Sequence, residues 1–234
     1  MRPIRGILLI VALAGVGVAA PLQCPTTPTA MSVYDALGFS CFISDKLFSN
    51  FTYSPTAGGN GVPVPDTAVF VTADTLDPNN PGFHFASSAW TVSSSVNDTF
   101  DSFVDSTINF DVATLSGQAL IDDNTLTLNA FSSSGLGFFL AVDEQYTPDP
   151  SGLGLHVHSD PFSTTTTDHR VFTPINALHV TKDLFLGAEN HTTSTATITQ
   201  FSENFSEIGA PEPLGFVLMG SGLIGLGIRR RSRK

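Results

Sequence analysis

The sequence predicts an all-β protein, namely one antiparallel β-sandwich with jelly-roll-like connections and a short apolar helix at each end of the chain. Three observations support this fold class. Apolar and polar residues alternate along many short segments, clusters of Gly, Asn, Asp and Pro separate these segments, and helical periodicity is nearly absent. About nine to eleven short strands at such spacing are typical of a two-sheet sandwich.

The alternation is clearest where apolar residues recur at every second position. Ile108, Phe110 and Val112 form one such series, and Phe83 and Phe85 form another. Because side chains of a strand point alternately to its two faces, each series predicts one buried face and one polar face. Similar series are Leu126–Ala130, Leu153–Val157 and Ala196–Ile198.

Two local features interrupt this pattern. A short helix is expected near Met31–Leu37, and the run Asp122-Asp123-Asn124 between two apolar pairs predicts a hairpin loop. The segment 21–209 contains eighteen of the nineteen Phe residues. We expect these rings to fill the space between the two sheets, since each buries on the order of 150–250 Å².

The composition excludes several classes of protein. With 41% hydrophobic and 13% charged residues, the chain has enough apolar surface to offset chain entropy, which argues against intrinsic disorder. Between residues 21 and 210 there are three basic residues and twenty acidic ones. Such a surface repels phosphate backbones, so we expect no nucleic-acid partner. The length of 234 residues allows one sizeable domain at 21–209.

The first twenty residues are typical of a secretory signal peptide. Arg2 and Arg5 precede an uncharged apolar stretch that ends in small residues at position 20. Cleavage is expected after Ala20 or, alternatively, after Ala19. The pattern therefore predicts a signal helix at 1–20, export by the Sec machinery, and loss of this segment from the mature protein.

The C-terminal segment, 210–234, has three parts in a fixed order. A Pro-Glu-Pro tripeptide comes first, an apolar run over 214–228 follows, and a basic cluster ends the chain. The run is short for the ~30 Å hydrocarbon core, and the basic cluster would stay on the cytoplasmic side. We therefore expect a short transmembrane helix that stops transfer. The tripeptide is Pro211, Glu212 and Pro213, and the stop-transfer cluster is Arg229, Arg230, Arg231, Arg233 and Lys234.

This C-terminal arrangement resembles the PEP-CTERM sorting signal of exported bacterial proteins. The resemblance covers about the last 25 residues, and a looser one includes Gly38–Tyr53 and the stretches Lys182-Asp183-Leu184 and Phe201-Ser202-Glu203. The resemblance of the C-terminal segment implies recognition by an exosortase, which is a membrane protease-transpeptidase. It also implies a location at the cell envelope, the cell surface or the extracellular matrix. Such proteins are commonly linked to exopolysaccharide and biofilm, which makes exopolysaccharide a possible partner.

Cys24 and Cys41 are the only cysteines and both follow the presumed cleavage site. An even pair in an oxidising compartment favours a disulfide, which would tie the first segment to the sandwich. The alternative is two unpaired buried thiols.

Candidate chemistry in the domain is sparse. His156 and His158 share one strand face with Asp160 close behind, which is a possible ligand pattern, but no third ligand can be placed. Acidic loops could bind Ca²⁺, although solvation is the commoner role. The acids concerned are Asp122 with Asp123, and Asp98 with Asp101 and Asp105. No nucleophile elbow or phosphate loop occurs in the domain, so we predict neither an enzyme, a metal nor a cofactor.

Three functions remain as hypotheses. The first is a non-enzymatic exported matrix or surface protein, and the second is a carbohydrate-binding module. For the second, stacking on sugars would fall to amphipathic aromatic residues, and the candidates are Trp90, Tyr34, Tyr53 and Tyr146. The third is a glycosidase-like enzyme, which would need two close, partly buried carboxylates in a cleft.

Overall fold

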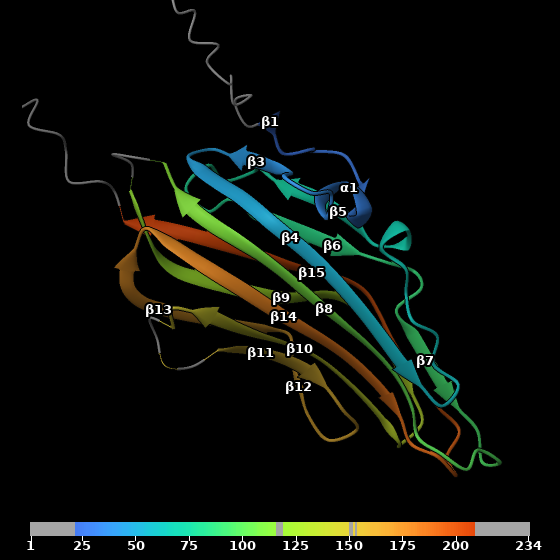
Figure 1. Cartoon of the computed structure of the whole chain (residues 1–234). Coiled ribbons are helices and arrows are strands. Elements are labelled where there is room, and N and C mark those ends of the chain that lie inside the picture. Colours follow the sequence, from blue (N-terminus) through green and yellow to red (C-terminus); the bar gives the residue numbers. More distant parts are fainter. Residues whose placement is uncertain (1–21, 116–118, 150–151, 153, 209–234) are drawn as a thin grey trace, which may run out of the picture.

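The computed structural model describes residues 22–115, 119–149, 152 and 154–208. Within these residues the chain forms two packed β-sheets, with nearly all neighbouring strands antiparallel (Figure 1). The all-β, two-sheet prediction is confirmed. The signal helix of 1–20, the Pro211–Pro213 tripeptide and the basic cluster from Arg229 to Lys234 lie outside the described residues. No helix in the described part of the chain is long and apolar enough to cross a bilayer.

The first sheet has eight strands in the order β1-β3-β4-β8-β14-β10-β11-β12. Its long central strands pair over almost their whole length, and among the strands that the structure describes only β1 and β3 run parallel. The strands are β1 (Leu22–Gln23), β3 (Ser40–Ile43), β4 (Lys46–Gly58), β8 (Ser102–Thr114), β14 (Ala177–Ala188), β10 (Phe138–Thr147), β11 (Leu155–Ser159) and β12 (Thr164–Thr165).

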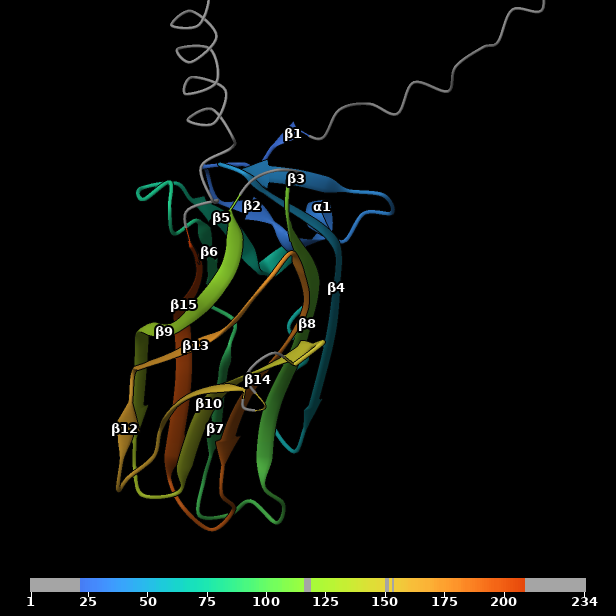
Figure 2. The same ribbon diagram turned by 90° about the vertical axis from the view of Figure 1, so that its left-hand side faces the viewer.

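The second sheet has the order β13-β9-β15-β6-β5-β2, and β7 also pairs with β15. Figure 2 shows the two layers from the side, with β4 and β8 in one layer and β6, β9 and β15 in the other. The strands are β2 (Thr29–Ala30), β5 (Phe70–Asp74), β6 (Gly82–Ala86), β7 (Thr91–Ser94), β9 (Leu120–Ser134), β13 (Thr167–Ile175) and β15 (Ser194–Ile208). The helices are α1 (Met31–Tyr34) and the 3₁₀ turn η1 (Asp66–Ala68).

The core lies between the sheets, where the predicted apolar series meet. Phe83, Phe85 and Phe110 are fully buried and form edge-on and stacked ring pairs with their neighbours. The only tryptophan, Trp90, is 0% exposed, and its indole N–H donates to the Ser106 hydroxyl at 3.3 Å. Large rings in such close contact stabilise a core beyond the area that they bury.

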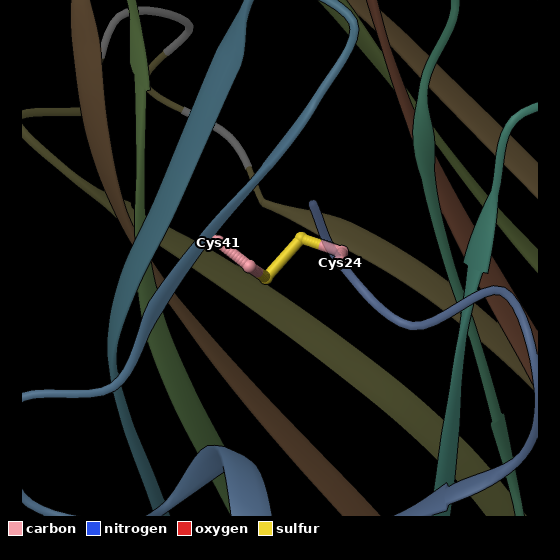
Figure 3. Close-up of a disulfide and its surroundings, with 2 residues drawn as sticks. All are labelled: Cys24 and Cys41. Atoms are coloured by element: carbon pink, nitrogen blue, oxygen red, sulfur yellow. A yellow bond between two sulfur atoms is a disulfide. The ribbon is translucent and has the colours of Figure 1, made fainter. Parts of the chain in front are cut away.

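A disulfide joins Cys24 to Cys41, as predicted (Figure 3). It connects the residue after β1 to strand β3, and both half-cystines are buried. The segment between them contains α1, within the stretch where a helix was expected. Met31 and Tyr34 of this helix are fully buried, so the bridge closes the chain around a part of the core.

The predicted hairpin loop at Asp122–Asn124 is wrong. These residues lie inside the continuous strand β9, which pairs with both β13 and β15. Ser206 faces Asp123 and Glu207 faces Ile121, so Asp122 is the extra residue of a β-bulge. Because of the bulge, Asp122 and Asp123 both lie on the solvent side, and Asn124 still points inward. Three consecutive polar residues therefore occur within a strand, and their composition is the same as that of a polar turn.

Candidate functional site

The outer face of the eight-stranded sheet carries three phenylalanines where polar residues would be expected. Alternation along β8, β10 and β14 turns Phe103, Phe139 and Phe185 away from the core. Phe139 is 38% exposed, and the other two rings are partly exposed. A group of exposed large apolar side chains is informative because it is a common mark of a binding surface.

These three rings form a continuous strip, which we call the aromatic strip. The centroids of Phe103 and Phe185 lie 6.0 Å apart with their planes 15° from parallel. Phe139 lies on the other side of Phe185 at 6.1 Å. The strip is at the end of the sheet remote from β3, because Phe103 pairs with Gly58 at the end of β4 and Lys46 pairs with Thr114 at the other.

Two glycines make room for these rings. A Cβ atom placed on Gly58 would lie 2.3 Å from Cε1 of Phe103, and one on Gly187 would lie 3.0 Å from Cε1 of Phe185. Gly58 and Gly187 are the neighbours of Phe103 on the two flanking strands. The rings therefore lean over backbone that has no side chains and occupy defined positions on the sheet.

A hollow of about 400 Å³ lies along the aromatic strip. The three rings and Gly187 form much of its wall, and the carboxylates of Asp101 and Glu189 stand at its edge. This volume is within the range of small-molecule sites, which are mostly apolar with a few placed polar groups.

A second hollow of about 380 Å³ is lined by polar residues of the same face. Asp183 in its wall is two residues from Phe185 on β14, so the two hollows are neighbours along that strand. We call its lining the polar patch. Its residues are Thr107, Asp143, Gln145, Thr181 and Asp183.

Asp183 is an acid of the polar patch with a perturbed pKa. Partial burial raises the pKa of Asp183 to about 6, and a hydrogen bond and charge repulsion from Asp105 add to this effect. In the described structure, Oδ1 of Asp105 is buried and has no hydrogen-bond donor. A hydroxyl-rich ligand could donate hydrogen bonds to the exposed carboxyl group of Asp183.

The histidine pair lies at the margin of this face on β11. The rings of His156 and His158 stack with centroids 4.8 Å apart, which confirms that they share a strand face. His156 contacts Asp143 at 2.6 Å, and His158 contacts Ser163 at 2.9 Å. Among the described residues, no group of three or more His, Cys, Asp or Glu side chains is arranged to hold a metal ion.

Three of the acidic residues considered for Ca²⁺ lie at one end of the sandwich or on the outer face. Asp98 accepts the Ser95 backbone N–H at 2.7 Å and the Asn60 amide at 2.8 Å, and these contacts help to lower its pKa. Asp101 accepts the Asn190 backbone N–H at 2.9 Å. They organise loops at one end of the sandwich, whereas Asp105 belongs to the outer face.

Between the sheets lies a group of charged and polar side chains that the sequence analysis missed. We call it the interior cluster, and its members come from β9, β10, β14 and β15. Each is at most 5% exposed. The members are Asn124, Glu144, Tyr146, Lys182 and Glu203.

Lys182 is the only cation of the interior cluster. Its Nζ contacts Oε2 of Glu144, and it lies 2.8 Å from Oε2 of Glu203. Burial works to lower the pKa of Lys182, but the two glutamates more than offset this and raise it. Burial, followed by the charge of Glu144, raises the pKa of Glu203 to about 8. At neutral pH Lys182 is therefore an ammonium and Glu203 a carboxylic acid.

Two pairs of carboxyl groups bear on the glycosidase hypothesis. Glu144 and Glu203 are close together but sealed between the sheets, at 1% and 0% exposure, where no sugar could reach them. Asp183 is exposed and Asp105 is partly buried, but they hydrogen-bond to each other. A retaining glycosidase keeps its carboxyl groups about 5 Å apart to hold the sugar between them. Neither pair has the arrangement that the reaction needs.

The amphipathic aromatic residues proposed for sugar stacking are in the wrong place. Trp90, Tyr34 and Tyr146 are buried, and Tyr53 packs against the core with its hydroxyl donating to the Val64 carbonyl at 2.9 Å. The expectation that the phenylalanines all fill the core is also wrong, because three of them form the aromatic strip. Composition could not separate these groups, since the alternation phase of each strand decides which face a ring joins.

No protein-family model matches the sequence, and the search of curated proteins gives no match. Among solved structures, a carbohydrate-binding module, TmCBM61, described in complex with β-1,4-galactotriose, is 12% identical. The match covers 65% of this chain and 88% of that one, with a TM-score of 0.28. Endoglucanase 3 of Trichoderma harzianum, from family GH12, is 10% identical over 67% of this chain and 98% of its own, with a TM-score of 0.24. At such TM-scores these likenesses carry no argument about function.

Proposed function

We propose that this protein binds a polysaccharide on the outer face of its eight-stranded sheet. The observation that supports this function is the aromatic strip with the polar patch beside it. A sugar ring has an apolar face of C–H groups and an edge of hydroxyls, so it needs an aromatic surface and hydrogen-bonding groups side by side. Phe185 and Asp183 provide this combination two residues apart on one strand.

The charge of the face limits the class of polysaccharide. Asp105, Asp143 and Asp183 stand on it, and neither hollow is lined by Lys or Arg. An anionic polysaccharide would be repelled, so the ligand is a neutral or amino-sugar polymer. Asp105 and Asp183 hydrogen-bond to each other and hold no sugar between them, and we therefore assign binding without cleavage.

Binding is tested on the purified protein with an array of neutral, amino-sugar and uronic-acid polysaccharides, followed by calorimetry on the best ligand. Phe185→Ala removes the middle of the aromatic strip and should weaken binding by about tenfold or more, equivalent to about 1.4 kcal/mol. The matched control is Phe162→Ala. Phe162 is 94% exposed in the turn between β11 and β12, outside both hollows.

Three results would contradict the proposed function. They are the absence of binding to every neutral and amino-sugar polymer, equal loss of affinity in the two variants, and preferential binding of uronic-acid polymers. Unchanged thermal unfolding of Phe185→Ala would show that a loss of affinity does not come from a loss of fold.

We propose further that the chain is exported and sorted through its C-terminal segment, with the Sec machinery and an exosortase as partners. The basic and apolar order of the two ends supports this, together with the resemblance of 210–234 to a sorting signal. The Cys24–Cys41 disulfide is compatible with an oxidising compartment. A structural role at the cell surface or in the matrix would follow from polysaccharide binding there.

Sorting is tested by replacing Pro211, Glu212 and Pro213 with alanine in the native host. The variant should accumulate at the membrane in an unprocessed form. Unchanged processing and location would exclude this segment as the sorting signal, and the result would leave the binding assay unaffected.

A further inference from the structure

The interior cluster brings an amine, a carboxamide and two carboxyl groups into one buried site. Glu144 contacts Lys182 Nζ through Oε2 and the Asn124 amide nitrogen through Oε1. Glu203 does the same from the other side, with Lys182 at 2.8 Å from Oε2 and the Asn124 nitrogen at 2.9 Å from Oε1. Two carboxyl groups thus bridge the same amine and the same amide.

This double bridge places the two bridged groups near each other. The two contacts to Glu203 are 2.8 Å and 2.9 Å long, and Glu144 contacts the same two nitrogens. The lysine nitrogen is therefore on the order of 4–5 Å from the amide. Lys182 comes from β14 of one sheet and Asn124 from β9 of the other. The cluster is therefore a point where a side-chain bond could join the two sheets.

We propose that Lys182 and Asn124 form an intramolecular isopeptide bond, with Glu144 and Glu203 as the catalytic proton carriers. The lysine proton first passes to the carboxylate of Glu144, which turns an ammonium and a carboxylate into a neutral amine and a neutral acid. The lysine nitrogen then attacks Cγ of Asn124 and forms the new C–N bond. The bond from Cγ to the amide nitrogen breaks, and that nitrogen leaves as ammonia.

The proton count balances without any other reactant. Lys182 begins with three protons on Nζ and the Asn124 amide with two. After the reaction one proton remains on the new amide, three leave with ammonia, and one stays on Glu144. Nothing is oxidised or reduced, and no external group is required.

Burial favours this reaction because it removes charge from the core. An ammonium and a carboxylate between two sheets carry a large desolvation penalty, whereas an amide and two carboxylic acids carry a much smaller one. Tyr146 assists, with its hydroxyl 3.1 Å from the Asn124 nitrogen. A half-turn of the Asn124 amide would place its carbonyl oxygen against this hydroxyl and against Glu203, whose burial raises its pKa and keeps it a donor at neutral pH.

The protein contains its own control for this chemistry. Lys46 is also fully buried and contacts Glu207 at 2.9 Å and Asp45 at 3.3 Å. Its described contacts include no carboxamide. Lys46 should therefore keep a free amine, although its burial and its charged partners resemble those of Lys182.

The test is mass spectrometry of the purified full-length chain after reduction, unfolding and trypsin digestion. The expected intact mass is lower than the sequence mass by one molecule of ammonia. Trypsin should cut after Lys46 and Arg170 but not after Lys182, since an acylated lysine is not a cleavage site. The fragment 47–170, which contains Asn124, should remain joined to the fragment 171–229.

Three variants sharpen the assignment. Lys182→Met and Glu144→Gln should each keep the full mass expected from their sequences, and in Glu144→Gln trypsin should cut after Lys182. Asn124→Asp should still form the bond, but with loss of water in place of ammonia.

The proposal can be refuted with the unmodified protein alone. The test therefore remains valid even if a variant fails to fold. The full sequence mass together with cleavage after Lys182 would show that no bond forms. Loss of water from the unmodified protein would place the bond on Glu144 or Glu203 and exclude Asn124.

Discussion

Breaking the Cys24–Cys41 disulfide should destabilise the domain without changing any other covalent bond. The bridge spans a sequence separation of 17 residues. Reduction leaves both sulfur atoms in the protein, so its effect isolates the cross-link from the packing of the side chains. Cys24→Ala/Cys41→Ala removes the sulfur atoms as well.

The size of the effect follows from the loop that the bridge closes. A loop of this length gives about 3 kcal/mol in the chain-entropy model, because the reduced unfolded chain has more conformations. In the native state the loop holds Tyr34 in the core, where its ring lies 5.1 Å from Phe51 and 5.9 Å from Phe83. We therefore expect the unfolding free energy to fall by about 3 kcal/mol on reduction. The double alanine variant should lose about 1 kcal/mol more for each buried sulfur.

Urea unfolding followed by tryptophan fluorescence measures this difference. Trp90 is the only tryptophan and is fully buried, so its emission reports on the core alone. The oxidised protein, the reduced protein and the double variant are compared at one pH, with the variant also measured in reductant as a control. The slope of the free energy against urea should rise on reduction, because the unlinked chain exposes more surface.

A difference of less than about 1 kcal/mol between oxidised and reduced protein would refute the reasoning. It would mean that the segment between the cysteines is held by its packing alone, or that it is already unfolded in the native ensemble. A response of the double variant to reductant would show that the reductant acts on something other than this bridge.

Two other predictions concern the outer face. Gly58→Ala should displace the Phe103 ring and weaken polysaccharide binding by about tenfold in calorimetry, whereas equal affinity would show that Phe103 is not in the site. Asp183 has a folded-state pKa of about 6, above its unfolded value, so the folded state binds more protons between these values. The unfolding free energy of the unmodified protein should therefore decline from about pH 4 to pH 6 more steeply than that of Asp183→Asn. Parallel pH profiles from urea titrations would contradict this assignment.

Much of the sandwich could be predicted because burial follows the period of two. Ile108, Phe110 and Val112 are all fully buried, as their alternation requires. The error at Asp122 has a physical cause. A β-bulge shifts the alternation of inward and outward residues, so the strand contains consecutive polar residues like those of a turn. The terminal assignments, which depend on 1–20 and 210–234, stay predictions.

The amino-acid composition could not predict the aromatic strip, but the alternation of buried and exposed residues along each strand does predict that its rings point outward. Phe103 is followed by the buried residue Val104, and Phe185 is preceded by the buried residue Leu184. In a strand, a ring next to an inward residue must point outward. What the pattern could not give is the sheet order, which places β8, β14 and β10 side by side. Distant pairing is decided by the packing of the whole core, so the site needed the structure.

The interior cluster could have been predicted in part from the sequence, because each of three strands has a charged residue at an inward position. Glu144 follows Leu140 and Val142 at the inward positions of β10, Lys182 follows Leu178 and Val180 on β14, and Glu203 stands between Phe201 and Phe205 on β15. A charged residue in phase with a buried series predicts a charged partner, because an isolated buried charge is too costly to retain. One lysine and two glutamates occupy inward positions, and they need one another as partners. The three strands that carry them must therefore lie close together in the core. The same argument applied to Lys46 on β4 predicts the inward acid at Glu207, and that ion pair is present.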